Sequence, residues 1–341
     1  MLKAVVTGCD THPVKSLALM LRSVGFEVSM LSDDAIRKLS KSRHPQGNSY
    51  KGGVTAELLK NMGYVPAGLP LVGPEALETC DLYIDIKVPD ADAMIQMYPR
   101  LKDKTIIFLI NGGGDEYVKY GDHYPVITTN FHVASNAFQV YMPFDNVHNL
   151  VPREKQVSFE PAMGLLHNPY NWGFRHILDT VIEKTGVRIF GSYEAPMGIL
   201  PNEKVGDYLS KSLAFVHLKA SDCPGYALYE AFATATPVVV TDLFIERMKY
   251  RDLYIDGETC LTWGKTSFTV KEDGRIEEYM EREKDTMVNE IVDCLEKLKD
   301  PEYNYQIGMA GYRKWKEMTE WTPEKRLELI KFLRKRNIRC D

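Results

Sequence analysis

The stretch from Ser221 to Asp242, SDCPGYALYEAFATATPVVVTD, restricts the fold more than any other part of the chain. A Pro-Gly pair breaks the chain before a helical run, and the run PVVVT from Pro237 to Thr241 follows the helix directly. Four apolar or β-branched residues in a row, bounded by Pro and Asp, are typical of a strand buried on both faces of a parallel sheet. The stretch therefore predicts loop, helix and strand, with one carboxylate, Asp222, in the loop and a second, Glu230, in the helix.

The composition favours a soluble α/β protein of two domains. The chain has 341 residues, of which 44% are hydrophobic and 26% charged, and this length fits two domains better than one. No apolar run approaches the length of a membrane helix, and the opening MLKAVVTGCD lacks the long apolar segment of a signal peptide. We therefore expect a cytoplasmic protein without a membrane span. The net charge of −5 does not indicate a polyanion partner for the molecule as a whole.

The cysteines argue against a structural metal site. All six are widely scattered, without a CxxC pair or a Cys/His cluster at zinc spacing. We expect reduced, mostly structural thiols. The acids Asp90 and Asp92 follow a proline, so the sequence indicates a helix cap there rather than a metal-binding Asp-x-Asp motif.

The first 150 residues read as a doubly wound α/β domain. A strand at 3–8 is followed by a helical pattern of apolar residues up to Gly25 and by a second strand, FEVSML. Further strands are predicted at 82–88, 105–110 and 125–129. Ligands of such domains lie at the carboxyl ends of the strands. The first turn, TGCDTHP, does not match the dinucleotide fingerprint, so NAD or FAD binding is not expected.

Two loops of this domain are candidate ligand-binding segments. The polar, basic stretch from 40 to 53 is either a solvated connection or an acceptor-binding loop, whose contacts would come from Arg43, His44, Asn48, Tyr50 and Lys51. The glycine turn NGGG at 111–114 suits either a phosphate or a close approach of backbone to substrate. His132 follows the last strand, where it is either a structural hydrogen-bonding residue or part of a cleft.

A second α/β domain follows an irregular, proline-containing stretch at 141–155. It is predicted to contain strands near 158–166, at 187–191 and at 213–218, and helices at 172–184 and 202–211, before the opening stretch adds another helix and strand. Helices at 285–299 and 324–336 end the chain. We expect domains at 1–150 and 151–320 facing a central cleft, with residues 321–341 packing back on the first. The basic last helix is either a solvated face or a nucleic-acid contact.

These segments together resemble the retaining glycosyltransferases of the GT-B architecture, such as glycogen synthases and bacterial mannosyltransferases. In that family a segment like SEGFGLVLLEAMAxGxPVV carries two acids with seven residues between them, as Asp222 and Glu230 do here. Residues 253–262, LYIDGETCLT, and 300–311, DPEYNYQIGMAG, are similar to later family segments, as are EWTP and SLALMLRSVGFEV. The resemblance is good over 186–335 and weaker over 1–30.

The resemblance implies roles for individual residues. Glu230 would accept hydrogen bonds from the ribose of a nucleotide-sugar donor, and Asp222 would lie beside the transferred sugar. Backbone amides of Gly225, Tyr226 and Ala227 would face the donor diphosphate at the start of a helix. The alternative is purely structural, with Asp222 capping the helix and Glu230 buried against a partner.

The sequence departs from the family where the donor diphosphate is usually bound. The family motif GRLxxxKG supplies an Arg and a Lys, but this chain has Leu165 and Trp172 in those places. Arg175, His167 or Lys219 would have to substitute. In the first domain, His132 is similar to a family histidine near the donor sugar and is therefore a second catalytic candidate.

The resemblance implies a retaining, metal-independent transfer from a UDP- or GDP-sugar to an acceptor hydroxyl, with no cofactor required. The acceptor is open: a glycan, a small molecule, or hydroxymethylated bases in DNA, as in bacteriophage DNA glycosyltransferases. Two other hypotheses stay open. One is a nucleotide-sugar epimerase, which needs no acceptor, and the other is a non-catalytic nucleotide-binding or scaffold protein.

Overall fold

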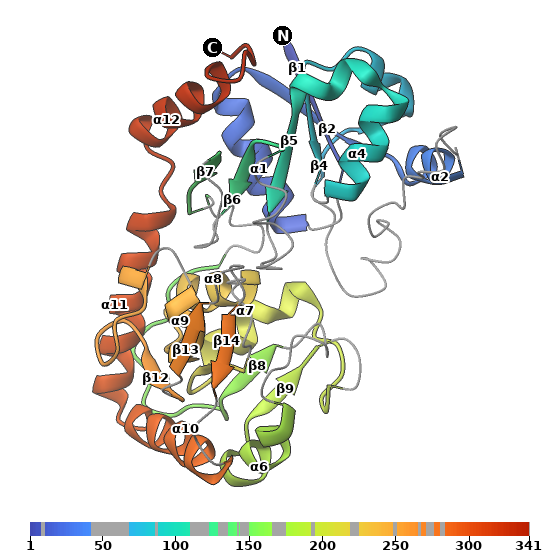
Figure 1. Cartoon of the computed structure of the whole chain (residues 1–341). Helices are drawn as coiled ribbons and strands as arrows, with labels where there is room; N and C mark the ends of the chain where they lie inside the picture. Colours follow the sequence, from blue (N-terminus) through green and yellow to red (C-terminus); the bar gives the residue numbers. More distant parts are fainter. Residues whose placement is uncertain are drawn as a thin grey trace. The chain divides into compact units, whose positions relative to one another are not determined.

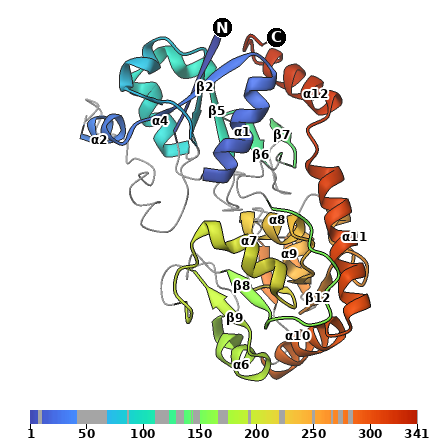
Figure 2. The same cartoon turned by 180° about the vertical axis from the view of Figure 1, so that it is seen from behind.

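The computed structural model describes the chain in a set of ranges separated by gaps. These ranges are 1–7, 11–41, 68–85, 88–109, 123–128, 136–141, 143, 150–165, 175–191, 195–218, 225–247, 251–264, 267–270, 276–279 and 284–340. The chain forms two compact units (Figures 1 and 2). Unit 1 contains residues 1–110, 116–145 and 320–341, and unit 2 contains 111–115 and 146–319. Among the described helices, none is long and apolar enough to cross a membrane.

Unit 1 is built on a seven-stranded parallel sheet with the order β3-β2-β1-β4-β5-β6-β7. The strands are β1 (Leu2–Val6), β2 (Phe26–Leu31), β3 (Leu71–Val72), β4 (Leu82–Asp85), β5 (Thr105–Leu109), β6 (Val126–Thr128) and β7 (Ala137–Gln139). The helices among them are α1 (Thr11–Ser23), α2 (Asp33–Lys41) and α4 (Val88–Met97), with 3-10 turns at Pro74–Glu78 and Pro99–Lys104. The chain adds β2 and β3 on one side of β1 and then returns to β4 on the other side. The strand order therefore reverses between β1 and β4.

The first helix shows why this unit folds as the sequence predicts. Val14, Leu17, Leu21 and Val24, which recur at helical spacing, are all buried. Residues 4–6 of β1 are buried too, as expected for a central strand of a parallel sheet. The predicted strand at 82–88 is too long, because β4 ends at Asp85 and Val88 already begins α4. Proline suits the first turn of a helix, so Pro89 marks the new element rather than the end of a strand.

The end of the chain packs on unit 1 through helix α12 (Pro323–Arg334). Phe332 contacts Phe138 of β7, with ring centroids 5.5 Å apart, and Trp321 Nε1 donates to Ser23 Oγ at 2.9 Å. Arg336 lies beyond the end of the helix, where it donates to the carbonyl of Asn136 at 3.2 Å and stacks on Phe332. Arg336 is therefore a packed residue and not part of a solvated basic face.

Unit 2 has a five-stranded parallel sheet with the order β12-β11-β10-β8-β9. Its strands are β8 (Met163–Leu165), β9 (Arg188–Phe190), β10 (Phe215–His217), β11 (Val238–Thr241) and β12 (Leu261–Trp263). Its helices are α6 (Arg175–Thr185), α7 (Asn202–Lys211), α8 (Gly225–Ala233), α9 (Asp242–Arg247), α10 (Lys284–Leu298) and α11 (Pro301–Thr319), with a 3-10 turn at Arg251–Leu253. The α7 bounds match the predicted 202–211. One apolar core, drawn mainly from α6, α10 and the strands, joins these layers.

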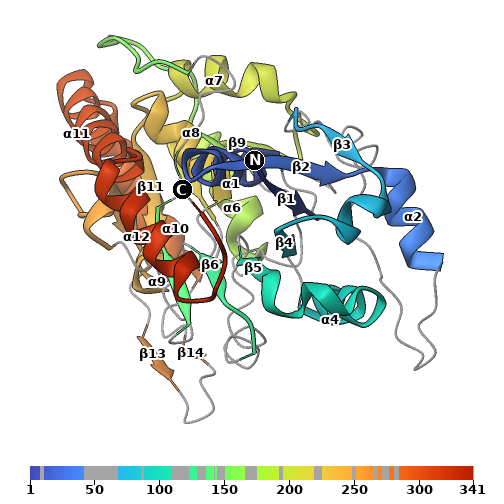
Figure 3. The same cartoon turned by 90° about the horizontal axis from the view of Figure 1, so that it is seen from above.

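Sequence reasoning missed an antiparallel hairpin of β13 (Ser267–Val270) and β14 (Ile276–Tyr279). Figure 3 shows it at the margin of unit 2, apart from α11. Its connection contains the turn pair Asp-Gly at 273 and 274, between two short runs rich in β-branched and aromatic residues. That pattern is a recognised hairpin signal and would have predicted the element.

Candidate functional site

The carboxyl edge of the unit 2 sheet gathers the residues of the opening stretch. β10 ends at His217, and α8 begins at Gly225 after the connection that follows this strand. β11, next to β10, ends at Thr241. The helix packs against β10 and β11 and lies against α7 and α11. Ligands of open parallel α/β sheets bind at this edge, so the observed topology makes it the candidate site.

Glu230 is the acidic residue of α8, and its side chain is 5% exposed. Its neighbours Leu228, Tyr229 and Phe232 are buried as well, so the helix is enclosed on several faces. Burying a carboxylate is costly unless hydrogen bonds or charges compensate it. A buried acid at this place therefore has to be held by polar contacts, either within the protein or to a ligand.

The beginning of α8 supplies backbone donors on the same helix. The amides of Gly225, Tyr226 and Ala227 belong to the first turn, where N–H groups have no acceptor within the helix. With a rise of 1.5 Å per residue, Gly225 lies about 7.5 Å along the axis from Glu230. The helix thus carries backbone donors at its start and a carboxylate acceptor at a fixed separation from them.

The other end of α8 is held by a chain of hydroxyl groups. Thr234 Oγ1 donates to the carbonyl of Glu230 at 2.9 Å and lies 2.9 Å from Thr236 Oγ1. Thr236 Oγ1 in turn donates to the carbonyl of Leu209 in α7 at 2.8 Å. These bonds satisfy helix-terminal carbonyls and fix the position of Glu230 relative to α7.

Helix α11 approaches the turn after α8 at backbone contact. A Cβ on Gly308 would lie 2.1 Å from the carbonyl oxygen of Ala235, and one on Gly311 would lie 2.8 Å from the carbonyl oxygen of Thr259. Ala235 itself has a left-handed backbone, with φ of 53°. Glycine adopts this backbone most easily, so an alanine here is uncommon.

An aromatic cluster lies beneath this edge and was not singled out from the sequence. The buried His217 ring lies 4.5 Å from Phe244, and Tyr254 contacts both Phe244 and Phe232, at 5.6 and 5.9 Å between ring centroids. The signal was present, because a histidine at the end of the apolar run LAFVHL is an unusual strand residue. Because Phe232 belongs to α8 and Phe244 to α9, the cluster packs these two helices together.

The end of β12 is fixed by a second acidic residue that sequence reasoning missed. Glu290 of α10 accepts a hydrogen bond from the backbone amide of Gly264 at 2.7 Å. Gly264 has φ of 66°, and a Cβ there would lie 3.4 Å from Thr241 Oγ1. The glycine lets the chain turn next to the end of β11.

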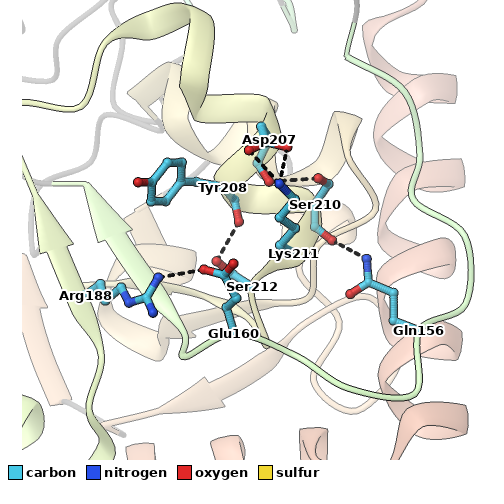
Figure 4. A network of polar contacts seen from close by, with 8 residues as sticks. All are labelled: Gln156, Glu160, Arg188, Asp207, Tyr208, Ser210, Lys211 and Ser212. Carbon is cyan, nitrogen blue, oxygen red and sulfur yellow. Dashed lines mark hydrogen bonds and ion pairs between the residues drawn. The ribbon is translucent and has the colours of Figure 1, made fainter.

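The opposite, amino edge of the sheet holds a network of charges (Figure 4). Arg188 pairs with Glu160 at 2.6 Å, Lys211 pairs with Asp207 at 2.7 Å, and Gln156 donates to the carbonyl of Ser210 at 2.7 Å. The Arg188 and Gln156 contacts join the start of β9 and the end of α7 to the segment that enters the unit, whereas the Lys211–Asp207 pair lies within α7.

The buried Arg153 anchors the same segment. Its guanidinium donates to the carbonyl of Ser212 at 2.5 Å and to the side chain of Asn304, while its backbone amide donates to Thr234 O at 3.0 Å. Burial lowers the pKa of Arg153 to about 10. The amino edge is therefore a structural region in which charged groups join neighbouring elements.

Glu230, Gly225, Tyr226 and Ala227 all belong to α8. Arg175 is the first residue of α6, the helix that follows β8, so its backbone also belongs to the carboxyl side of the sheet. The remaining candidates lie outside the described residues. They are Asp222, His132, Lys219, His167 and Trp172, together with Arg43, His44, Asn48, Tyr50 and Lys51 of the predicted acceptor loop.

No protein-family model matches the chain, and no curated protein matches it in sequence. Solved structures do match over nearly the whole length. Sucrose-phosphate synthase from Thermosynechococcus elongatus superposes with a TM-score of 0.60 at 12% identity, covering 98% of this chain and 99% of that one. HepE from Anabaena, in complex with UDP-glucose, gives 0.59 at 13% identity, covering 98% and 100%.

A third similar structure is an alpha-glucosyltransferase in complex with UDP and a 13-mer DNA containing a central A:G mismatch. It superposes with a TM-score of 0.59 at 13% identity, covering 97% of this chain and 98% of that one. At such identities the likeness establishes the fold. The chain has the GT-B fold expected from the sequence, with two parallel α/β sheets.

Proposed function

We propose that this protein is a glycosyltransferase that moves a sugar from a nucleotide-diphosphate sugar, of the UDP type, to an acceptor hydroxyl. The observation that carries the proposal is the placement of Glu230 and the first turn of α8 at the carboxyl edge of the unit 2 sheet. The full-length likeness to structures that contain UDP-glucose or UDP supports UDP over GDP.

In this proposal α8 binds two parts of the donor. The Glu230 carboxylate, which only accepts hydrogen bonds, receives the vicinal ribose hydroxyls, and the amides of Gly225 to Ala227 face the diphosphate. Asp222, which precedes the helix in sequence, remains the residue proposed to lie beside the transferred sugar. Arg175 and Lys219 remain the candidates for neutralising the phosphates in place of the family Arg and Lys.

We propose a transfer that retains the anomeric configuration and needs no metal. The bond between the anomeric carbon and the diphosphate oxygen breaks, and the acceptor oxygen bonds to the same face of that carbon. The acceptor proton passes to the leaving diphosphate. The enzyme then acts through positioning and through stabilisation of the developing charges. An inverted product would contradict this part of the proposal.

DNA is the second candidate acceptor, because one of the similar structures is a glucosyltransferase bound to DNA. A hydroxymethylated base would offer the acceptor hydroxyl, and the enzyme would have to flip that base out of the duplex. The exposed Lys331, Arg334 and Lys335 at the end of α12 are compatible with phosphate contacts. A small polyol or a glycan remains the alternative acceptor.

The donor is tested by calorimetry with UDP, GDP, ADP and UDP-glucose. We expect UDP and UDP-glucose to bind and Glu230→Gln to weaken both, while Glu328→Gln on the exposed face of α12 serves as the matched control. Acceptors are then tested by UDP release from UDP-glucose, with 5-hydroxymethylcytosine duplex, unmodified duplex and a glycan panel. Absence of nucleotide binding, or sugar isomerisation without transfer, would refute the proposal.

A further inference from the structure

Helix α11 lies at the margin of unit 2 (Figures 1 and 2) and buries one of its faces. Gly308 and Gly311 belong to that face, close to the backbone carbonyls of Ala235 and Thr259. The row of residues beside it recurs at every third or fourth position, with exposed ends and a partly exposed middle. It consists of Glu302, Tyr305, Met309, Tyr312 and Lys316, and we call it the α11 row.

The middle of the α11 row is apolar and aromatic, although a partly exposed helix row is usually polar. Alternating steps of three and four residues are the spacing at which side chains of two packed helices interlock. Tyr and Met are also enriched in the buried centres of protein–protein interfaces. The opposite flank of α11 is already occupied, because Lys314 pairs there with Asp252 at 3.6 Å. The row therefore has the composition and spacing that suit a second helix.

The charges of the α11 row are arranged symmetrically about Met309. Glu302 precedes Met309 by seven residues and Lys316 follows it by seven, so each lies about 10 Å from it along the helix axis. When two copies of the helix pack antiparallel about a twofold axis at Met309, Glu302 of each copy faces Lys316 of the other. Tyr305 of one copy then lies near Tyr312 of the other. The row is thus complementary to itself, which a twofold interface requires.

The charged ends of the row remain accessible to such a partner. Glu302 pairs with Lys155, and the two side chains are 56% and 47% exposed. A carboxylate has about four acceptor positions, so Glu302 can keep this pair and accept from a second ammonium group. Lys316 is exposed, with its Nζ 5.9 Å from the centroid of the Tyr312 ring. A second copy can therefore join these groups without breaking a buried bond.

We propose that the α11 row is the centre of a twofold interface with a second copy of this chain, in which the two α11 helices pack antiparallel and cross at Met309. The inference is independent of the proposed transferase function, because it uses only the surface of α11. A contact between single helices is smaller than a standard interface. We therefore expect a weak homodimer, with a Kd on the order of 10 µM.

The first test is sedimentation equilibrium of the full chain, wild type and Met309→Glu, over a concentration series that spans the expected Kd. The substitution places two like charges together at the twofold axis, so we expect the variant to stay monomeric. Leu327→Glu is the matched control, because Leu327 is an exposed apolar residue of another helix, α12. The control should dimerise like wild type, and thermal unfolding at low concentration verifies that both variants are folded.

The second test uses two charge reversals, Glu302→Lys and Lys316→Glu. Each variant alone puts like charges opposite each other at both ends of the row, so each should dimerise about tenfold more weakly than wild type. In an equimolar mixture, a Glu302→Lys chain meets a Lys316→Glu chain with opposite charges at both ends. We therefore expect the mixture to form a heterodimer. A substitution that only disturbs the folded chain would not be rescued by mixing.

The outcomes decide the inference as follows. A wild-type dimer that is lost in Met309→Glu and regained in the mixture of the two charge reversals supports it. A wild-type protein that stays monomeric at every concentration overturns it. A dimer that persists in Met309→Glu, or that Leu327→Glu abolishes equally, also overturns it, because the interface then lies elsewhere. A mixture that associates no better than its two components overturns the antiparallel pairing on which the inference depends.

Discussion

The two edges of the unit 2 sheet place charged groups in opposite ways. At the amino edge, Arg153 is buried among carbonyl oxygens and the Asn304 side chain, and Arg188 is paired with Glu160. At the carboxyl edge, α8 brings the buried Glu230 close to a helix terminus. The same sheet thus has one edge where polar groups join neighbouring elements and one where we propose that a ligand binds.

The difference teaches that burial and charge do not by themselves identify a site. Arg153 and Glu230 are both buried, but the described contacts of Arg153 join several elements of one unit. Strand direction separates the two cases, because ligands bind at carboxyl ends of parallel strands. If this interpretation is correct, variants at the amino edge change stability alone, and Glu230 variants change ligand affinity.

The largest effect is expected for Arg153→Met. The substitution leaves Ser212 O and the Asn304 side-chain oxygen without their buried donor, which lowers the free energy of unfolding by about 3 kcal/mol. Urea denaturation measures the loss. The affinity for UDP, measured by calorimetry, should stay within about twofold of the wild-type value. A large loss of affinity in a folded Arg153→Met protein would contradict the separation of the two edges.

The next largest effect is expected for Gly308→Ala. The new methyl group would meet the backbone oxygen of Ala235 at 2.1 Å, and backbone cannot rotate away, so we expect a loss of about 2 kcal/mol. Gly206→Ala in α7 is the control, because its methyl would meet the flexible Leu150 side chain at 2.2 Å. The control should be nearly neutral in urea denaturation, since alanine also favours the helix. Equal losses in both variants would refute the backbone explanation.

A smaller effect, on affinity rather than stability, is expected for Glu230→Gln. Gln keeps the shape but loses the charge, so hydrogen bonds from ribose hydroxyls weaken and the Kd for UDP rises about tenfold. Thermal unfolding without ligand should stay close to the wild-type value, because Gln keeps the shape of the side chain and can still accept a hydrogen bond. A lower Tm together with unchanged UDP affinity would show that Glu230 is a structural residue.

The smallest stability effect is expected for Arg188→Met at the amino edge. Its pair with Glu160 is partly exposed, and such pairs contribute at most about 0.5 kcal/mol. Urea denaturation should therefore barely distinguish this variant from wild type. It is the matched control for Arg153→Met, with the same substitution at a partly exposed position of the same edge.

The pair of Lys155 and Glu302 offers a test by titration. Hydrogen bonding and charge from Lys155 hold the pKa of Glu302 below its ordinary value, and Gln306 contributes as well. The stabilisation is present above the unfolded pKa of Glu302 and is lost as the pH falls through its folded pKa. Lys155→Gln should raise the pKa of Glu302, as measured by NMR titration, whereas Lys299→Gln should leave it in place.

Sequence reasoning predicted the elements whose apolar pattern is regular. α1, β2, α7 and β11 follow from the spacing of buried residues, because one face or both faces of each must be apolar. It missed β7 and the hairpin of β13 and β14, which are short, and in short strands periodicity carries little information.

The candidate site was predictable only in part. Glu230 and the first turn of α8 follow from one contiguous stretch, so their spacing is visible in the sequence. Glu290 reaches Gly264 across 26 positions. Only the packing of α10 near β12 brings these two groups together, and no local pattern encodes the contact.

The return of residues 320–341 to unit 1 bears on how the protein is made. Unit 1 contains the first residues of the chain and also the last, with Phe332 against β7 and Trp321 against Ser23. A chain that emerges from the ribosome amino end first cannot complete unit 1 until residues 320–341 have been made. Unit 2, drawn almost entirely from 146–319, has all its residues earlier. Unit 2 can therefore complete its fold before unit 1, although most of unit 1 is encoded first.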